Sequence, residues 1–330
     1  RVEARPGQQL HLAAVSAPDA RAAAQVYPAN AWLSLAAIPE GPLDTQEVVS
    51  TIKACMACHQ VGDESTRRIP ESLETFEHEA LRRFYRDWNR PDLMGVVAVG
   101  DFDGAEVEAL LIEHFEGIAA PESPRERPVY SVPDHDETLF AITTDEELPS
   151  TSFTVYHNMA LDEDETIGGY RQRMLERLYN SMLNLRFSEI TRQPDPPFLG
   201  ASSSKGRLVS TKGAYVLSAS VPEDGIERGL EVVFTEAERV ARFGFTASEL
   251  ERQKINLLRG IESSYTDREN RSSGSYAAEY IRAFLDGEAI PGIEYEYELY
   301  KRFVPGISLE EVNQVGSDWI RTENRVVVVT

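Results

Sequence analysis

Long apolar runs and basic residues are both scarce in this 330-residue sequence. No apolar run approaches the roughly 20 residues that a helix needs to span a bilayer. Lys and Arg number 33 against 55 Asp and Glu, so the formal net charge is −22. A surface of this charge repels phosphate backbones and anionic lipids. The composition therefore argues against a membrane span, and against nucleic acid or a membrane surface as partner. It is compatible with a wall around cationic or unfolded peptide.

Histidine and cysteine are also scarce, which limits the metal sites that the chain can build. The only two cysteines are Cys55 and Cys58. No two of the six histidines are four residues apart; they are His11, His59, His78, His114, His135 and His157. Because no second Cys/His pair lies near the cysteines at ligand spacing, a zinc site built on them is disfavoured.

The two cysteines nevertheless belong to the most explicit chemical motif of the chain, CMACH, which ends at His59. Two thiols three positions apart, followed at once by a histidine, are typical of a c-type haem attachment site. Cys55 and Cys58 would each add to a vinyl group of the porphyrin, and the His59 imidazole would bind the iron. A disulfide, a redox dithiol or idle thiols remain the alternatives. Covalent haem would also imply a periplasmic or cell-envelope setting.

The residues around CMACH predict a small, irregular β/loop segment. Apolar residues alternate over 9–15 and predict one strand of a β module, while residues 46–54 predict a short helix. With CMACH, residues 26–29 and 65–70 weakly resemble haem proteins in which a carboxypeptidase-regulatory-like module precedes a cytochrome c domain. Because the stretch after CMACH is too short to wrap a porphyrin, we expect residues 1–77 to be a truncated form of such a protein.

From residue 79 the pattern changes to long helices and well-separated strands. Residues 81–88 carry apolar side chains at helical spacing and predict an amphipathic helix that ends before Pro91. Residues 94–99 predict a short buried strand, and residues 107–115 predict a second amphipathic helix. The charged, proline-rich stretch 119–130 predicts a linker.

Beyond the linker, the pattern predicts an α+β domain in which a mixed β-sheet is layered with long helices. Strands are expected near 138–144, 151–157, 198–203, 214–221 and 325–330, and helices over 165–192 and 226–240. Capping boxes at 246–249 and 308–311 begin two further helices. The chain starts at Arg1 without a methionine and stops inside an apolar strand pattern, so we expect it to be part of a longer polypeptide.

Several separated blocks resemble the insulinase/pitrilysin family of zinc metallopeptidases. In the order of that family they are residues 81–103, 132–138, 244–252, 284–288, 291–298 and 323–329. The resemblance covers residues 79–330. It implies that residues 78–118 are the end of the first peptidase domain. It also implies that residues 131–330 are the second, non-catalytic domain, one wall of a closed proteolytic chamber.

The zinc site of that family is missing from the sequence. The family binds zinc through an inverted HxxEH helix, which supplies two histidine ligands and a glutamate base, and through a later glutamate. The nearest match here, Glu77-His78, lacks the partner histidine. The resemblance therefore implies a fragment that is inactive alone, with a peptide substrate and the remaining domains of the parent peptidase as partners, and with zinc only in the complete enzyme.

Two alternative functions remain open from the sequence. One is a c-type haem electron carrier that uses CMACH. The other is peptide binding without cleavage, at a sheet edge of the chamber wall. Because the haem-like segment loses its end and the peptidase its start between Pro70 and Glu79, the join predicts a deletion or assembly junction between two originally separate proteins.

Overall fold

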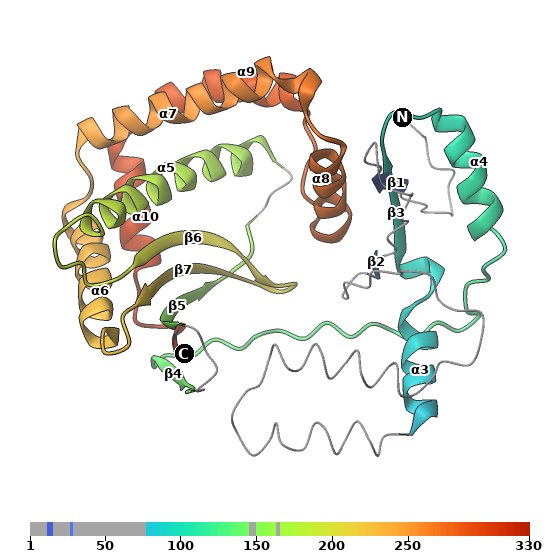
Figure 1. Cartoon of the computed structure of the whole chain (residues 1–330), viewed down its shortest axis with the longest axis horizontal. Helices are drawn as coiled ribbons and strands as arrows, with labels where there is room; N and C mark the ends of the chain where they lie inside the picture. Colours follow the sequence, from blue (N-terminus) through green and yellow to red (C-terminus); the bar gives the residue numbers. More distant parts are fainter. Residues whose placement is uncertain (1–11, 16–26, 29–76, 145–149, 163–165) are drawn as a thin grey trace. The chain divides into compact units, whose positions relative to one another are not determined.

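A computed structural model describes residues 12–15, 27–28, 77–144, 150–162 and 166–330 (Figure 1). The chain divides into two compact units. Unit 1 comprises Arg1–Pro128 and Glu269–Ile290, and unit 2 comprises Val129–Arg268 and Pro291–Thr330. The first crossing from unit 1 to unit 2 falls within the proline-rich stretch 119–130.

Unit 1 contains a three-stranded sheet with β3 (Met94–Val99) at its centre. The strand β1 (Leu12–Val15) pairs with β3 in parallel, and β2 (Tyr27–Pro28) pairs with it antiparallel. Before β3 come α3 (His78–Trp88) and the short η1 (Pro91–Leu93), and α4 (Gly104–Phe115) follows. These elements confirm the predicted helix, strand and helix, but β3 is mostly half-buried rather than buried.

A helix from far along the chain completes unit 1. The helix α8 (Ser273–Asp286) packs against β3 and belongs to unit 1, although α7 before it and α9 after it belong to unit 2. The close approach is at Gly95, where an added Cβ would lie 3.0 Å from the ring of Phe284. A side chain at Gly95 would therefore require the Phe284 ring to shift, so the close contact favours glycine at this position.

Unit 2 is built on a five-stranded mixed sheet of order β4-β8-β5-β7-β6. Its strands are β4 (Leu139–Ile142), β5 (Thr151–Met159), β6 (Gly200–Val209), β7 (Lys212–Val221) and β8 (Arg325–Val329). β4 and β8 run parallel, and the other neighbours run antiparallel. The C-terminal strand thus lies inside the sheet, and β6 lies at one edge.

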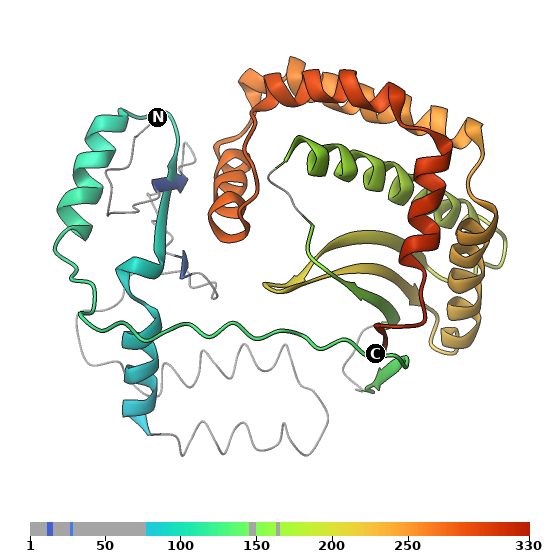
Figure 2. The same cartoon turned by 180° about the vertical axis from the view of Figure 1, so that it is seen from behind.

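Helices cover one face of this sheet (Figure 2). The helices of unit 2 are α5 (Ile167–Ile190), α6 (Ile226–Phe243), α7 (Ala247–Thr266), α9 (Ile293–Phe303) and α10 (Leu309–Trp319), with short turns at η2 (Arg268–Asn270) and η3 (Val304–Gly306). Alternate β5 residues such as Phe153 and Val155 pack with α5 residues such as Leu183 in the core. Both predicted capping boxes form, at Thr246 and at Ser308. The expected α+β class is therefore confirmed.

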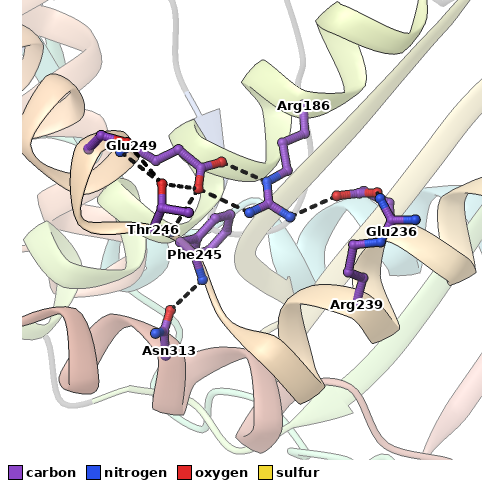
Figure 3. A network of polar contacts seen from close by, with 8 residues as sticks. Arg186, Glu236, Arg239, Phe245, Thr246, Glu249 and Asn313 are labelled. Atoms are coloured by element: carbon purple, nitrogen blue, oxygen red, sulfur yellow. Dashed lines mark hydrogen bonds and ion pairs between the residues drawn. The ribbon is translucent and has the colours of Figure 1, made fainter.

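One arginine joins three helices of unit 2 (Figure 3). The Arg186 guanidinium of α5 donates to Glu236 of α6 at 2.8 Å, and to both carboxylate oxygens of Glu249 on α7 at 2.7 and 3.0 Å. It also lies over the Phe245 ring, 4.9 Å from the centroid. Nearby, Asn313 of α10 accepts a hydrogen bond from the Phe245 N–H at 2.8 Å. This network fixes the helix layer against which the sheet packs.

Candidate functional site

A polar row crosses the helix-covered face of the sheet. Strand register places Lys205, Tyr215, His157 and Arg325 side by side on β6, β7, β5 and β8. The next row on this face, Ser203, Leu217, Val155 and Val327, is mostly apolar. A buried tyrosine and a buried histidine therefore lie between one cation, Lys205, and another, Arg325.

His157 is the unusual member of this row. It is only 2% exposed, and neither ring nitrogen has a hydrogen-bond partner among the described residues. Burial, and then the charge of Arg325, lower the pKa of His157 to about 4, while the Arg321 backbone opposes the shift. The imidazole is therefore neutral at pH 7. A neutral, enclosed ring cannot supply an exposed general base.

The Tyr215 hydroxyl belongs to a buried hydrogen-bond chain. It shares a hydrogen bond of 2.9 Å with the Ser203 hydroxyl, which donates to Asn180 on α5 at 2.6 Å. The Tyr215 ring packs against Trp319, with centroids 4.7 Å apart. Burial raises the pKa of the Tyr215 phenol well above its usual value, so it stays protonated. This chain fixes β6 against α5.

Lys205 is neutralised inside the protein. Its ammonium donates to Glu176 at 2.6 Å and to Asp162 at 2.7 Å, and its side chain is 8% exposed. Burial raises the pKa of Glu176, while the hydrogen bond and charge of Lys205 oppose that shift. A cation with two carboxylate partners has little charge left to offer a ligand.

A cavity of about 350 Å³ lies between the flank of α5 and β6. We call it the α5–β6 groove; its lining includes Arg177 and Asn184 of α5 and Ser203 and Arg207 of β6. Asn184 accepts from the Ser203 N–H at 2.6 Å and donates to the Ser203 carbonyl at 3.0 Å. These backbone groups therefore point away from β7. Since orientation alternates along a strand, those of Lys205 point outward too.

Arg177 is a groove cation that has no carboxylate partner among the described residues. It is exposed and donates to the Tyr300 hydroxyl of α9 at 2.8 Å. Burial raises the pKa of Tyr300, although the charge of Arg177 opposes the shift, so the partner is a neutral phenol. Within the described ranges, Arg177 forms no ion pair.

The haem site predicted from sequence involves residues that the structure does not describe. Cys55, Cys58 and His59 lie outside the described residues, so the haem site stays a prediction. In the part of the chain that the structure describes, no three His, Cys, Asp or Glu side chains gather as metal ligands, and no helix is long and apolar enough to cross a membrane. The groove was missed from sequence because it is formed by the packing of α5 beside β6, which no local pattern in the sequence specifies.

Comparison with known proteins identifies the family. The family model described as the peptidase M16 inactive domain matches residues 75–257. The chain belongs to the M16 (insulinase/pitrilysin) peptidase family. A zinc protease PQQL-like of Arabidopsis thaliana is 30% identical over 272 residues, which is 81% of this chain and 25% of that protein. A probable zinc protease PqqL of Haemophilus influenzae is 21% identical over 263 residues, 78% of this chain and 28% of that protein. The chain thus spans about a quarter of the length of these M16 relatives.

Solved M16 structures share the fold. The first half of the periplasmic protease PqqL from Escherichia coli superposes with a TM-score of 0.72 at 16% identity, covering 91% of this chain and 67% of that one. A peptidase M16 inactive domain from Pseudomonas fluorescens gives a TM-score of 0.62 at 14% identity, covering 90% and 72%. None of these relatives is named as a haem protein, so the comparisons give no support to the haem interpretation.

Proposed function

We propose that this chain is a non-catalytic part of an M16 zinc metallopeptidase and that it binds extended peptide along the outer edge of β6. The observation that supports this most strongly is the α5–β6 groove beside that edge. Within the described ranges, β6 is terminal in its sheet and only β7 pairs with it. An extended peptide can add to such an edge through main-chain hydrogen bonds, while its side chains enter the flanking groove.

Asn184 would set the position of the added strand. It already occupies the N–H and C=O of Ser203, so a peptide cannot pair there. The outward groups of Lys205 remain next along the strand. Pairing would therefore begin at Lys205 and continue toward Arg207.

The residues present do not fit a catalytic zinc site. No two histidines are four residues apart, and no three candidate ligands gather among the described residues. Zinc would belong to another part of the parent protease, in keeping with the name of the Arabidopsis relative. Peptide-bond hydrolysis is accordingly expected only in the complete enzyme.

The rest of the proposal concerns the place of this chain in the complete protease. We place residues 78–118 at the end of the first peptidase domain, 119–130 in the linker and 131–330 in the second domain, the chamber wall. The remaining domains of the parent peptidase are the partners of this part. A periplasmic or envelope location is supported by the name of the Escherichia coli neighbour, a periplasmic protease.

A peptide-binding assay tests the proposal. The probes are fluorescent Thr/Val peptides of about nine residues, which favour extended structure, with Glu, Gln or Lys at the centre. We expect at least one to bind the 330-residue chain and to remain uncut with zinc added. N-methylation at alternate positions should abolish binding, whereas methylation at the intervening positions should not. Failure of all three peptides to bind would refute the proposed function.

A further inference from the structure

We infer that the α5–β6 groove selects extended peptides that place an Asp or Glu side chain against Arg177. This inference rests on the proposed peptide binding and names the class of peptide. Four cations line the groove. Lys205 is enclosed and paired with Glu176 and Asp162, and Arg173 and Arg207 are each engaged within the protein. Arg177 is exposed and donates to the neutral phenol of Tyr300. Arg177 is therefore the groove cation that we expect to meet a ligand carboxylate.

Tyr300 holds the Arg177 side chain in place. Tyr300 is 6% exposed, and the Tyr170 ring packs edge-on against it with centroids 6.2 Å apart. The Tyr170 hydroxyl in turn donates to Glu296 at 2.7 Å. A long side chain fixed by a buried partner loses less conformational freedom when it binds a ligand. Arg177 is thus preorganised, and its remaining N–H groups can face a planar carboxylate.

The position of Arg177 suits a side chain of a peptide on β6. The groove is lined by Arg173, Arg177, Asn180 and Asn184, which are three or four residues apart and so share one flank of α5. Lys205 and Arg207 of β6 line its other side. In an added strand every second side chain points to the same face, so one can enter the groove while the backbone pairs with Lys205.

The experiment compares three peptides that are acetylated, amidated and identical except for a central Glu, Gln or Lys. The only carboxylate is then the side chain. Hydrogen bonds to charged groups are stronger than those between neutral groups, so we expect the Glu peptide to bind the 330-residue chain at least ~10-fold more tightly than the Gln peptide. The Lys peptide should bind more weakly than either. Equal binding of the Glu and Gln peptides would overturn the inference and leave the proposed function standing.

Arg177→Gln should remove the preference for Glu, so that the Glu and Gln peptides bind with equal affinity. Its matched control is Arg252→Gln, an equal loss of charge at an exposed position on α7 away from the groove lining. Thermal unfolding should show both variants folded, because both arginines are exposed. A Glu preference that survives Arg177→Gln would contradict the assignment.

Two further measurements complete the test. One asks whether the anchoring of Arg177 by Tyr300 matters as well as its charge, and the other asks whether the carboxylate recognised is a side chain or a free C-terminus. Tyr300→Phe keeps the charge of Arg177 but removes its anchor, so the Glu preference should fall only in part; an unchanged preference would count against preorganisation. A Gln peptide with a free C-terminus tests the terminal carboxylate. If that peptide binds as tightly as the amidated Glu peptide, the groove recognises chain ends and the inference is wrong.

Discussion

Asn184 on α5 binds both backbone groups of Ser203 on the edge strand β6. A side-chain amide is the right shape for this role, because it presents one donor and one acceptor, as a neighbouring strand does. The contact satisfies the sheet edge at one point and leaves the adjoining residues available. Exposed edges invite unwanted pairing, so one closed position also limits which strands can add.

Removing this contact should destabilise unit 2. Asn184→Ala leaves the N–H and C=O of Ser203 without their partner, and we expect the free energy of unfolding to fall by about 1–3 kcal/mol. Asn184→Asp can still accept from the N–H but cannot donate to the carbonyl, so its free energy of unfolding should lie between those of wild type and Asn184→Ala. Urea denaturation measures both. Identical curves for wild type and Asn184→Ala would contradict the role of this contact.

Arg186→Met should be more damaging. It removes the cation that pairs with Glu249 and one of the two cations that pair with Glu236, whose side chain is 8% exposed. Losing one member of a largely buried ion pair costs about 3–5 kcal/mol, and the remaining Arg239 contact moderates this to about 2–3 kcal/mol. Arg242→Met, in an exposed pair on α6, is the control and should cost less than about 1 kcal/mol. Similar losses in the two variants would contradict the network.

Acid should weaken the same network. Burial would raise the pKa of Glu249, but hydrogen bonds from Arg186 and Thr246 outweigh it and lower this pKa from 4.5 to about 2. Stability from this group is complete above about pH 4.5 and is lost as the pH falls toward 2. Glu249→Gln should be less stable at neutral pH and lose less stability across that window. Chemical denaturation at a series of pH values tests this, with Glu238→Gln at an exposed pair as control.

His157 predicts a second, separate acid transition. The folded protein protonates His157 near pH 4, whereas the unfolded chain does so near 6.5. The unfolded state thus binds more protons between these values, and stability falls by roughly 2–3 kcal/mol as the pH drops through the window. His157→Leu should flatten this part of the pH profile, and exposed His114→Gln should not. If His157→Leu keeps the wild-type slope, the imidazole is not the group responsible.

The haem motif has a direct spectroscopic test. Expression with the haem-maturation machinery should give a Soret band only if Cys55 and Cys58 become attached to porphyrin. Because the matched relatives are proteases, we expect no stoichiometric haem. A band at one haem per chain that disappears in Cys55→Ala would reverse this expectation, and a shift in the band of His59→Ala would then identify the iron ligand.

Local signals in the sequence predicted much of the fold. The capping boxes at Thr246 and Ser308 need only residues three apart, and the apolar alternation around Val155 needs only one strand. These are properties of short segments. The parallel pairing of β4 with β8 is different, because the two strands are separated by nearly all of unit 2 and nothing local specifies the partner.

The groove also depends on tertiary packing, of α5 beside β6 and of Arg177 against Tyr300. Arg177 is one of many arginines in the sequence, and nothing local shows that its partner is the Tyr300 hydroxyl rather than a carboxylate. His157 gave a weak signal, since it occupies an inward position in an alternating strand. Its enclosure became clear only when the sheet placed Arg325 on one side and Tyr215 on the other.

The packing of α8 on β3 restricts how the protein can be shortened and the order in which it can fold. A cut after Pro128 would separate Gly95 from Phe284, leaving one face of β3 uncovered in the N-terminal piece and α8 without its sheet in the C-terminal piece. During synthesis, β3 emerges long before α8, so unit 1 can be completed only after most of unit 2 has been made. The two units are therefore distinct in structure, but neither can be transferred to another protein by a single cut in the chain.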